Sequence, residues 1–169
     1  NCRIESIIQQ SIDLAEMDSK RFGLEIRSFI PTNLPDCFLD PVLIEQVIVN
    51  LLKNGIDSMR GSIPLHLRSI AKPLYLIVDF DKTALTEMLR IRIIDCGHGI
   101  REDLINRIFE PFYSTKTEGM GMGLNICRSV VESHQGRLYV INNDNPAIRD
   151  INTETYLNID KGCTFIVLL

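Results

Sequence analysis

The chain of 169 residues is 45% hydrophobic and 24% charged, which is enough apolar material for one ordinary core. Its formal net charge of -4 offers no basic surface for nucleic acid and no polybasic stripe for an anionic membrane. No apolar run in the sequence approaches the roughly 20 residues of a membrane-spanning helix. We therefore expect one globular domain that contacts neither nucleic acid nor membrane.

The sequence begins inside a helical pattern and lacks the charged start and apolar middle of a signal peptide, so we expect a piece of a longer protein. Five cysteines are spread along it without a C-x-x-C pair, in apolar surroundings such as DCFLD and GCTFIVLL. This use of cysteine is typical of buried thiols in a reducing compartment. The predicted location is the cytoplasm, with the option of a membrane anchor upstream in the full-length protein.

Two helices and a strand are predicted in the first part of the chain. Apolar residues recur at helical spacing over 4–15, and residues 23–30 then alternate like a strand. Asp40 is a suitable N-cap, Pro41 suits the first helical position, and Gly61 is expected to end this second helix. The second helix carries one apolar stripe, formed by Leu43, Ile44, Val47, Ile48, Leu51 and Leu52.

The remaining chain alternates strands with loops and further helices. Strands are expected at 73–80 and 88–95, joined as a hairpin by 81–87, and at 137–142 and 163–169. The expected connections are a loop at 61–72, a short helix, a glycine-rich loop, a longer helix that ends near Gly136, and a long polar loop at 143–162. This order predicts an α+β fold, a two-layer sandwich with a mixed, mostly antiparallel sheet and helices on one face.

The stretch DCGHGI, residues 95–100, directly follows a predicted strand. Asp95 should stand at the strand end, where a carboxylate can accept a hydrogen bond from an exocyclic amine, and Gly97 and Gly99 would let a ligand approach the backbone. A turn that only closes the hairpin explains the same residues equally well, because Asp-x-Gly is common in turns.

A second glycine-rich stretch, GMGMGL at residues 119–124, precedes the longer helix. Its spacing is G-x-G-x-G with no strand before it, so it is not a dinucleotide fingerprint, and the chain has no Gly-Lys dipeptide for a Walker loop. The stretch is therefore a different phosphate cradle, or no phosphate site.

Asn50 and Asn54 lie four residues apart in the second helix, so their amides share a face beside the apolar stripe. A partly buried amide costs free energy unless it is hydrogen-bonded, and a metal ion bound through oxygen with a phosphate beside it would supply that contact. The alternative, favoured for an isolated Asn-x-x-x-Asn pair, is that both amides face solvent or cap a neighbouring turn.

The motifs NLLKN, DCGHGI, FEPFYSTK, GMGMGL and GCTF occur in this order along the chain. This order resembles the catalytic ATP-binding domain of sensor histidine kinases, within the superfamily of gyrase, Hsp90-type chaperone and MutL ATPases. The segment FEPFYSTKTEGMGMGLNICRSVVESHQGRL is most similar to the oxygen-sensing and nitrogen-regulatory branches. The resemblance covers residues 24–169 and implies the Bergerat fold, with 1–23 as the end of a preceding helical segment or linker helix.

The resemblance implies roles for individual residues. Asn54 would coordinate Mg²⁺, Asn50 would face the phosphates, and Asp95 would bind the adenine amine. Lys116 is a candidate phosphate ligand, and with Asn50 it makes the candidate catalytic pair. The other nucleotide-binding residues implied are Gly97, Gly99, Ile100, Gly119, Gly121, Gly123, Leu124 and Thr164.

Residues 113–122 would form a lid over ATP, with Phe109 and Phe112 of the phenylalanine box packed largely in the core beneath it. Glycine supplies positive φ and low bulk to such a hinge, and Gly121 and Gly123 would bring backbone N–H groups to the phosphates. The helix that starts near Gly123 would point its positive dipole end at the same anion.

The implied ligands are ATP and Mg²⁺, and the implied reaction is phosphoryl transfer to a histidine. His66, His98 and His134 lack the acidic neighbour of the family's phosphoacceptor, which lies on an upstream dimerisation domain of the same protein. Relatives that hydrolyse ATP carry glutamate at the position of Asn50, and asparagine cannot act as that base. The alternative is a nucleotide-gated module or ATPase of the same superfamily without phosphotransfer.

A response regulator is the expected downstream partner, with the isolated domain monomeric and the full-length protein a homodimer. Two features depart from the family pattern. Gly55 replaces the usual alanine after the second asparagine, which lowers the stability of the helix by roughly 1 kcal/mol because glycine has a lower helix propensity. The segment 143–161 is longer than usual, and surface tolerance is a better explanation for it than a regulatory contact.

Overall fold

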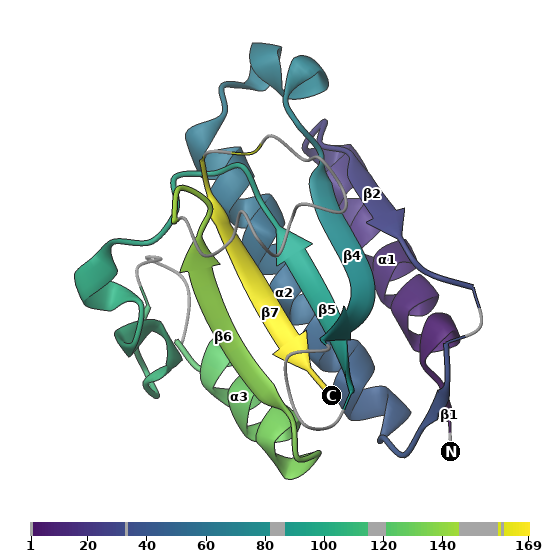
Figure 1. Ribbon diagram of the computed structural model, residues 1–169. Helices are drawn as coiled ribbons and strands as arrows, with labels where there is room; N and C mark the ends of the chain where they lie inside the picture. Colours follow the sequence, from purple (N-terminus) through teal and green to yellow (C-terminus); the bar gives the residue numbers. More distant parts are fainter. Residues whose placement is uncertain (1, 33, 82–86, 115–120, 146–158, 160) are drawn as a thin grey trace.

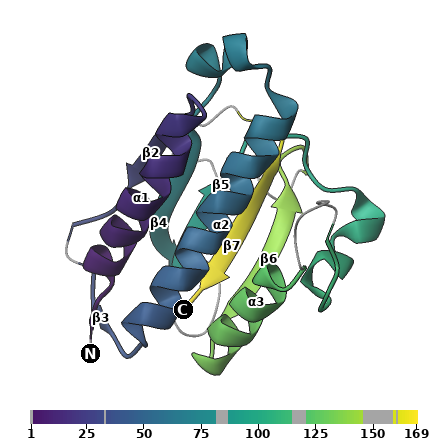
Figure 2. The same cartoon turned by 180° about the vertical axis from the view of Figure 1, so that it is seen from behind.

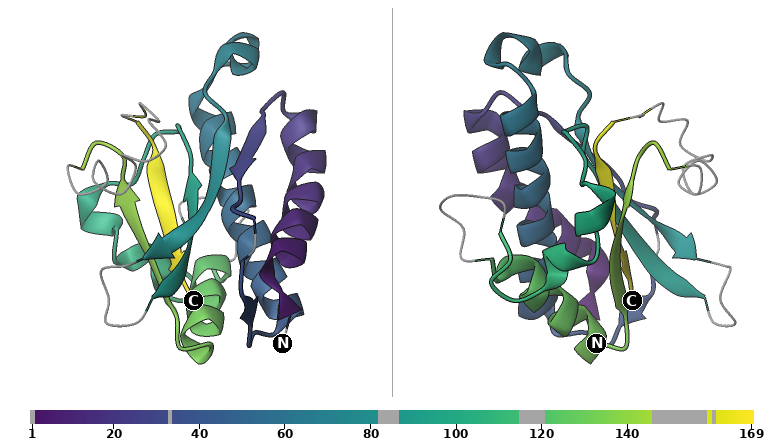
Figure 3. Two further views of the ribbon diagram at one scale, coloured as in Figure 1. Left: turned by 45° about the vertical axis from the view of Figure 1, so that its right-hand side comes forward. Right: turned by 90° about the vertical axis from the view of Figure 1, so that its left-hand side faces the viewer.

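The computed structural model describes residues 2–32, 34–81, 87–114, 121–145, 159 and 161–169. Within these residues the chain forms two layers, a five-stranded sheet and a layer of helices on one of its faces (Figures 1 and 2). Figure 3 shows the layers from two further sides, with the helices on one side of the twisted sheet. The predicted α+β sandwich is confirmed. None of the helices in the described part of the chain is long and apolar enough to cross a membrane.

The helices of this layer are α1 (Ile4–Arg21), α2 (Pro41–Ser62) and α3 (Gly123–Ser133). α2 begins as predicted, because the Asp40 carboxylate accepts hydrogen bonds from the backbone N–H groups of Val42 and Leu43 at 3.0 and 3.1 Å. The predicted end at Gly61 is wrong by one residue. Gly61 stays helical, and the helix closes after Ser62.

The sheet has the strand order β2-β4-β5-β7-β6. Its strands are β2 (Ile26–Phe29), β4 (Leu74–Asp81), β5 (Met88–Ile94), β6 (Arg137–Asn142) and β7 (Cys163–Leu168). β2 and β4 are parallel, since the long connection through α2 returns the chain in the same direction, and the other neighbouring pairs are antiparallel. The mixed, mostly antiparallel sheet and the β4–β5 hairpin are confirmed.

Several short elements were not predicted. The strands β1 (Cys2–Arg3) and β3 (Asp36–Cys37) form a small antiparallel pair, and the predicted loop at 61–72 contains the 3-10 helix η1 (Leu65–Ile70). The predicted short helix is two 3-10 turns, η2 (Glu102–Leu104) and η3 (Arg107–Phe109). η1 is fixed to the segments before it, because the guanidinium of its Arg68 donates to the carbonyls of Phe22, Arg60 and Ile63. Such a contact between distant segments leaves no periodic signal in the sequence.

One apolar core lies between the helices and the sheet. α1 packs along α2 and buries Ile4, Ile7, Ile8, Ile12 and Ala15, none of them more than 4% exposed. The predicted stripe of α2 is buried except for Leu43, which is 37% exposed. The division of the chain after residue 23 stays a prediction, although α1 shares its core with α2.

The sheet face that points away from the helices carries a smaller apolar cluster. Ile159, from the long connection between β6 and β7, packs there with Tyr75, Ile77 and Ile94 and is only 8% exposed. This contact gives at least one residue of the long connection a packing role on the sheet.

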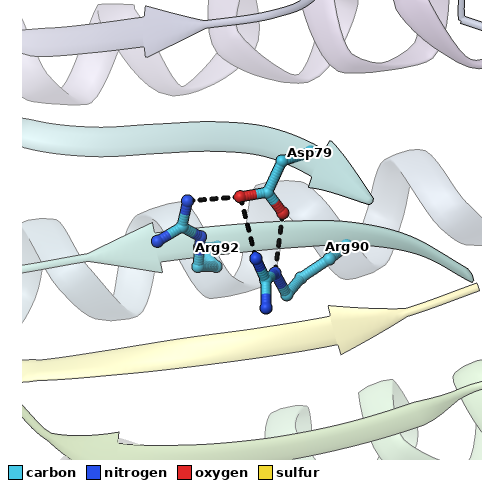
Figure 4. Close-up of polar contacts among 3 residues, drawn as sticks. All are labelled: Asp79, Arg90 and Arg92. Atoms are coloured by element: carbon cyan, nitrogen blue, oxygen red, sulfur yellow. Dashed lines mark hydrogen bonds and ion pairs between the residues drawn. The ribbon is translucent and has the colours of Figure 1, made fainter. Parts of the chain in front are cut away.

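The same face carries a charged cluster, in which Asp79 of β4 binds Arg90 and Arg92 of β5 (Figure 4). Arg90 donates from Nε and Nη2 to the two carboxylate oxygens at 2.7 and 3.1 Å, and Arg92 donates from Nη2 to Oδ2. The Arg92 side chain is 1% exposed. Asp79 therefore compensates a buried charge, which would be costly if left alone.

Candidate nucleotide-binding site

Asp95 follows β5 directly, as predicted, and is 1% exposed. Its Oδ1 accepts hydrogen bonds from the Gly97 N–H at 2.8 Å and from the Ser58 hydroxyl at 3.3 Å, and its Oδ2 accepts one from the Cys163 thiol at 3.1 Å. Its backbone N–H donates to the Cys163 carbonyl at 3.0 Å. The carboxylate is thus fixed from α2, from β7 and from its own loop.

Burial raises the pKa of the Asp95 carboxyl above its ordinary value, and the hydrogen bonds from Cys163, Gly97 and Ser58 offset part of that rise. When ionised, this carboxylate is a pure acceptor. Such an acceptor suits an amine donor and repels a carbonyl oxygen placed at the same point.

Gly97 and Gly99, the two glycines after Asp95, leave space that neighbouring atoms of the protein occupy. A Cβ on Gly97 would lie 2.1 Å from the Ser58 Oγ, so only glycine lets this loop lie against α2. Gly99 has φ +71°, and a Cβ there would lie 3.0 Å from the Asn142 Oδ1. The two glycines thus let the loop pack tightly against both α2 and the end of β6.

Asn50 and Asn54 are half-buried and lie one turn apart on α2. The Asn50 amide donates to the Cys127 sulfur of α3 at 3.7 Å, so it faces the junction between α2 and α3. Burial raises the pKa of the Cys127 thiol to about 11, which keeps the thiol protonated and uncharged at neutral pH. Ser58 continues the same row one turn further and reaches Asp95. One face of α2 thus connects the predicted metal and phosphate residues to the predicted base-binding carboxylate.

The second glycine stretch is described from Gly121 onward, while Lys116 and Gly119 lie outside the described residues. Gly121 has φ +65°, and a Cβ there would lie 2.6 Å from the backbone of Phe112 and Tyr113. α3 begins at Gly123 as predicted. The N–H groups of its first turn have no partner within the helix, and one turn further Cys127 of α3 meets Asn50 of α2.

The phenylalanine box is divided between core and surface. Phe109 is 4% exposed, and the Arg128 guanidinium lies 3.6 Å from the centroid of its ring. Phe112 is 78% exposed and has φ +63°. The expectation of core packing is confirmed for Phe109 and wrong for Phe112, whose backbone has positive φ and lies close to Gly121.

The remaining predicted residues are Ile100, Leu124 and Thr164. Ile100 and Leu124 are half-buried and pack against the main core. Thr164 is fully buried, and its hydroxyl donates to the Asn143 Oδ1 at 2.7 Å. The neighbour of Thr164, Cys163, is the residue of β7 whose side chain reaches the Asp95 carboxylate.

Sequence reasoning missed Ser58, Cys163, Asn142 and Asn143. Ser58 could have been found, since it continues the four-residue spacing of Asn50 and Asn54 on the helix. The others are recognisable only once β6, β7 and the loop after β5 lie side by side. Gly162 shows how close they come: it has φ +88°, and a Cβ there would lie 2.2 Å from the Asp95 carbonyl oxygen.

Gly55, which departs from the usual alanine, also has a local reason. A Cβ at this position of α2 would lie 2.6 Å from the Leu74 Cδ1 at the start of β4. Glycine lowers the helix propensity of α2 at this position. In return, it lets α2 lie close to β4, directly beside Asp95.

Residues 39–169 match the family described as histidine kinase-, DNA gyrase B-, and HSP90-like ATPase. The chain belongs to this family. The ATPase-family domain is 34% identical over 135 residues to the C4-dicarboxylate transport sensor protein DctS of Rhodobacter capsulatus, and 30% identical over 144 residues to the sensor protein FixL of Bradyrhizobium diazoefficiens. These alignments cover 80% and 83% of the chain but only 19% and 26% of the two relatives.

Solved structures show the same fold. Full-length ShkA in complex with AMPPNP matches 99% of the domain with a TM-score of 0.72 at 21% identity, over 30% of its own chain. The catalytic domain of the histidine kinase ThkA matches 99% with a TM-score of 0.68 at 22% identity, over 92% of its chain. The domain is thus of the ATP-binding catalytic type found in sensor histidine kinases.

Proposed function

We propose that this domain binds ATP with Mg²⁺ and transfers the γ-phosphoryl group to a histidine on a separate dimerisation domain of the same protein. In the transfer, the bond from the γ-phosphorus to the bridging oxygen breaks and a bond to an imidazole nitrogen forms, so that ADP leaves. The domain contributes position and charge, which are the main needs of this reaction.

The observation that carries the proposal is the row of α2 side chains that ends at a buried carboxylate. Asn50, Asn54 and Ser58 follow each other at one-turn spacing, and Ser58 hydrogen-bonds to Asp95. A nucleotide lying along this row would have its base at Asp95 and its phosphates toward the start of α3. The family membership and the AMPPNP complex of ShkA support nucleotide binding by this fold.

Magnesium would be bound by the Asn54 side-chain oxygen, together with phosphate oxygens and water. The donor set fits Mg²⁺, a hard cation that takes oxygen ligands and is usually bound by few protein groups together with phosphates. Within the described residues, no group of three or more His, Cys, Asp or Glu could hold a metal ion without the nucleotide. Bound Mg²⁺ would neutralise charge on the phosphates, and Lys116 is proposed as a second phosphate ligand.

Two of the three histidines of this chain make contacts within the fold. The His134 ring accepts at Nε2 from the Asp40 N–H at 3.0 Å, and its Nδ1 lies 2.7 Å from the Val130 carbonyl oxygen, so it joins α3 to the start of α2. The His98 Nδ1 lies 2.6 Å from the Gly99 carbonyl oxygen. His66 is exposed in η1. These contacts support a phosphoacceptor on another domain.

The test combines the chain with γ-labelled ATP, Mg²⁺ and the separately produced dimerisation domain. We expect acid-labile phosphohistidine on the dimerisation domain and none on the chain incubated alone. Free phosphate without labelled histidine would instead indicate an ATPase or nucleotide-gated module of the same superfamily. Label on His66, His98 or His134 would contradict the proposal.

Partners and location follow as parts of the same proposal. The phosphohistidine would pass its phosphoryl group to a response regulator, as sensor kinases of this kind do. We propose a cytoplasmic domain that is monomeric alone and belongs to a homodimeric full-length protein. Size-exclusion chromatography with light scattering on the chain and on the full-length protein tests both oligomeric states.

A further inference from the structure

Two consecutive asparagines, Asn142 and Asn143, stand at the end of β6. Asn142 is half-buried and Asn143 is 3% exposed. Neither residue has an assigned role in the site. Both side chains contact the loop formed by residues 95–100, which we call the base-reading loop because it begins at Asp95.

Asn142 holds the far end of the base-reading loop. Its Oδ1 accepts a hydrogen bond from the Ile100 N–H at 2.8 Å, and its Nδ2 donates to the Ile100 carbonyl at 2.6 Å. One side-chain amide thus satisfies both backbone groups of a single residue, as a neighbouring strand would do. Gly99, just before Ile100, has no room for a side chain against the same amide.

Asn143 holds the near end of the loop and joins it to β7. Its Nδ2 donates to the Asp95 carbonyl and to the Lys161 carbonyl, both at 2.7 Å, and its Oδ1 accepts from the Thr164 hydroxyl at 2.7 Å. Its backbone N–H donates to the Gly162 carbonyl at 3.0 Å. Every polar atom of this buried amide therefore contacts a segment that surrounds Asp95.

The strand geometry explains how adjacent residues reach both ends of the loop. Asn142 lies on the face of β6 that carries the core residues Leu138 and Val140, and the next residue of a strand points to the opposite face. Asn143 accordingly meets Thr164, whose register partner on β6 is Ile141. The two side chains thus approach the base-reading loop from two sides.

We propose that Asn142 and Asn143 form a two-point clamp that sets the shape of the base-reading loop, with Asn143 positioning Asp95 and Asn142 positioning Gly99 and Ile100. This inference rests on the proposed function, in which Asp95 binds the nucleotide base. The proposed role requires no direct contact of either asparagine with the ligand. Each acts through the backbone of the loop, so its removal should change how the base is read as well as how stable the fold is.

The two ends of the clamp have different expected effects. Without Asn143, the Asp95 carbonyl loses its donor and the carboxylate is less well placed, so base discrimination falls. Without Asn142, the loop loosens at Ile100 while Asp95 keeps its contacts with Ser58, Gly97 and Cys163. A purely structural role would lower stability in both variants and leave the ratio of ATP to GTP affinity as it is.

The test compares Asn143→Ala and Asn142→Ala with wild type and with Asn106→Ala, a control at an exposed asparagine whose side chain makes no cap hydrogen bond. Hydrogen exchange is measured on the nucleotide-free chain, and dissociation constants for ATP and GTP are measured by calorimetry with Mg²⁺. In Asn143→Ala we expect faster exchange at the Asp95 and Gly97 amides, about tenfold weaker ATP binding and a smaller preference over GTP. In Asn142→Ala we expect faster exchange at the Ile100 amide and weaker ATP binding with the base preference kept.

Unchanged exchange at the Asp95 and Gly97 amides in Asn143→Ala, or an unchanged preference for ATP despite weaker binding, would overturn the clamp. If wild type does not bind ATP, the proposed function fails, and the exchange data on the nucleotide-free chain still decide whether the clamp exists. Should either alanine variant fail to fold, the serine variants Asn142→Ser and Asn143→Ser are measured in the same way. They keep one polar atom but cannot make both bonds of the amide.

Discussion

The Cys163 thiol donates a hydrogen bond to the Asp95 carboxylate at 3.1 Å, inside the protein and across the β5–β7 pair. Burial and the neighbouring Asp95 charge raise the pKa of Cys163 well above its ordinary value, so the thiol keeps its proton and remains a donor. The predicted base-reading group is thus held by a cysteine from the last strand of the described chain, far away in sequence. This pairing couples the electrostatics of Asp95 to the packing of the sheet.

Asp95 should make the stability of the nucleotide-free chain depend on pH. Because the pKa of Asp95 is raised in the folded state, its contribution is fully present below the unfolded pKa of about 3.9 and is lost as pH rises through the folded value. The unfolding free energy of wild type relative to Asp95→Asn should therefore fall from about pH 4 toward neutral pH. Urea unfolding across this range measures the difference, with Asp103→Asn as an exposed control. If this difference in unfolding free energy stays constant or rises with pH, the pKa of Asp95 is not raised in the folded state.

Asn54→Ala should remove Mg²⁺-dependent ATP binding and leave the fold intact. The change deletes the proposed metal ligand, while alanine is the best helix former and the apolar face of α2 is untouched. Calorimetry with and without Mg²⁺ gives the affinity, and circular dichroism gives the helix content. Gln46→Ala, an exposed amide on the same helix, should bind ATP like wild type. If Asn54→Ala and wild type bind ATP with equal affinity both with and without Mg²⁺, α2 does not contribute to the metal site.

Local signals in the sequence were sufficient for the main helices and strands. Asp40, Pro41 and the apolar stripe predicted α2, because capping and amphipathic spacing act within a few residues. The two strand-like segments 73–80 and 88–95, joined by the polar connection 81–87, likewise predicted the β4–β5 hairpin. These features need no knowledge of distant segments, and so they could be predicted from one sequence.

The polar surroundings of the site could not be predicted in the same way. Cys163 and Asn143 meet Asp95 only because β7 lies between β5 and β6, an order that no local pattern states. Arg68 fixes η1 by donating to the carbonyl of Phe22, just after α1, and to that of Arg60 in α2, and the exposed Phe112 lies with its backbone against Gly121. In each case a tertiary contact decided what the local sequence left open.

Asp79→Ala should destabilise the domain strongly, although Asp79 lies outside the proposed site. The change leaves the buried Arg92 guanidinium and the nearby Arg90 without their shared carboxylate, which typically costs about 3 kcal/mol. The matched control is Asp103→Ala, which breaks the exposed pair with Arg101 and should cost less than about 1 kcal/mol. Chemical denaturation compares the two variants. Similar losses in both would mean that the cluster on the outer sheet face is not energetically special.

Substitution by alanine should change the unfolding free energy differently at two glycines of α2. Gly61 is exposed with no atom near its missing Cβ, so Gly61→Ala should raise the unfolding free energy by roughly 0.5–1 kcal/mol. At Gly55 the added methyl group would meet the Leu74 Cδ1 at 2.6 Å, so the same gain in propensity is offset by moving Leu74. Thermal and urea unfolding of both variants test this. Equal stabilisation by both would show that Leu74 yields without cost.

Asp95→Asn should weaken ATP binding and narrow the preference over GTP. The carboxylate accepts hydrogen bonds but cannot donate one, so it suits the amine at the six position of adenine and repels the carbonyl oxygen of guanine there. One such buried contact is worth about 1–3 kcal/mol, on the order of tenfold to a hundredfold in affinity. An amide at position 95 can present either its oxygen or its NH₂ group to the base, so discrimination is lost while the phosphate side is less affected. Competitive displacement of a fluorescent ATP analogue by ATP and by GTP measures the preference for ATP in wild type and in the variant. If the variant keeps the full preference, Asp95 does not read the base.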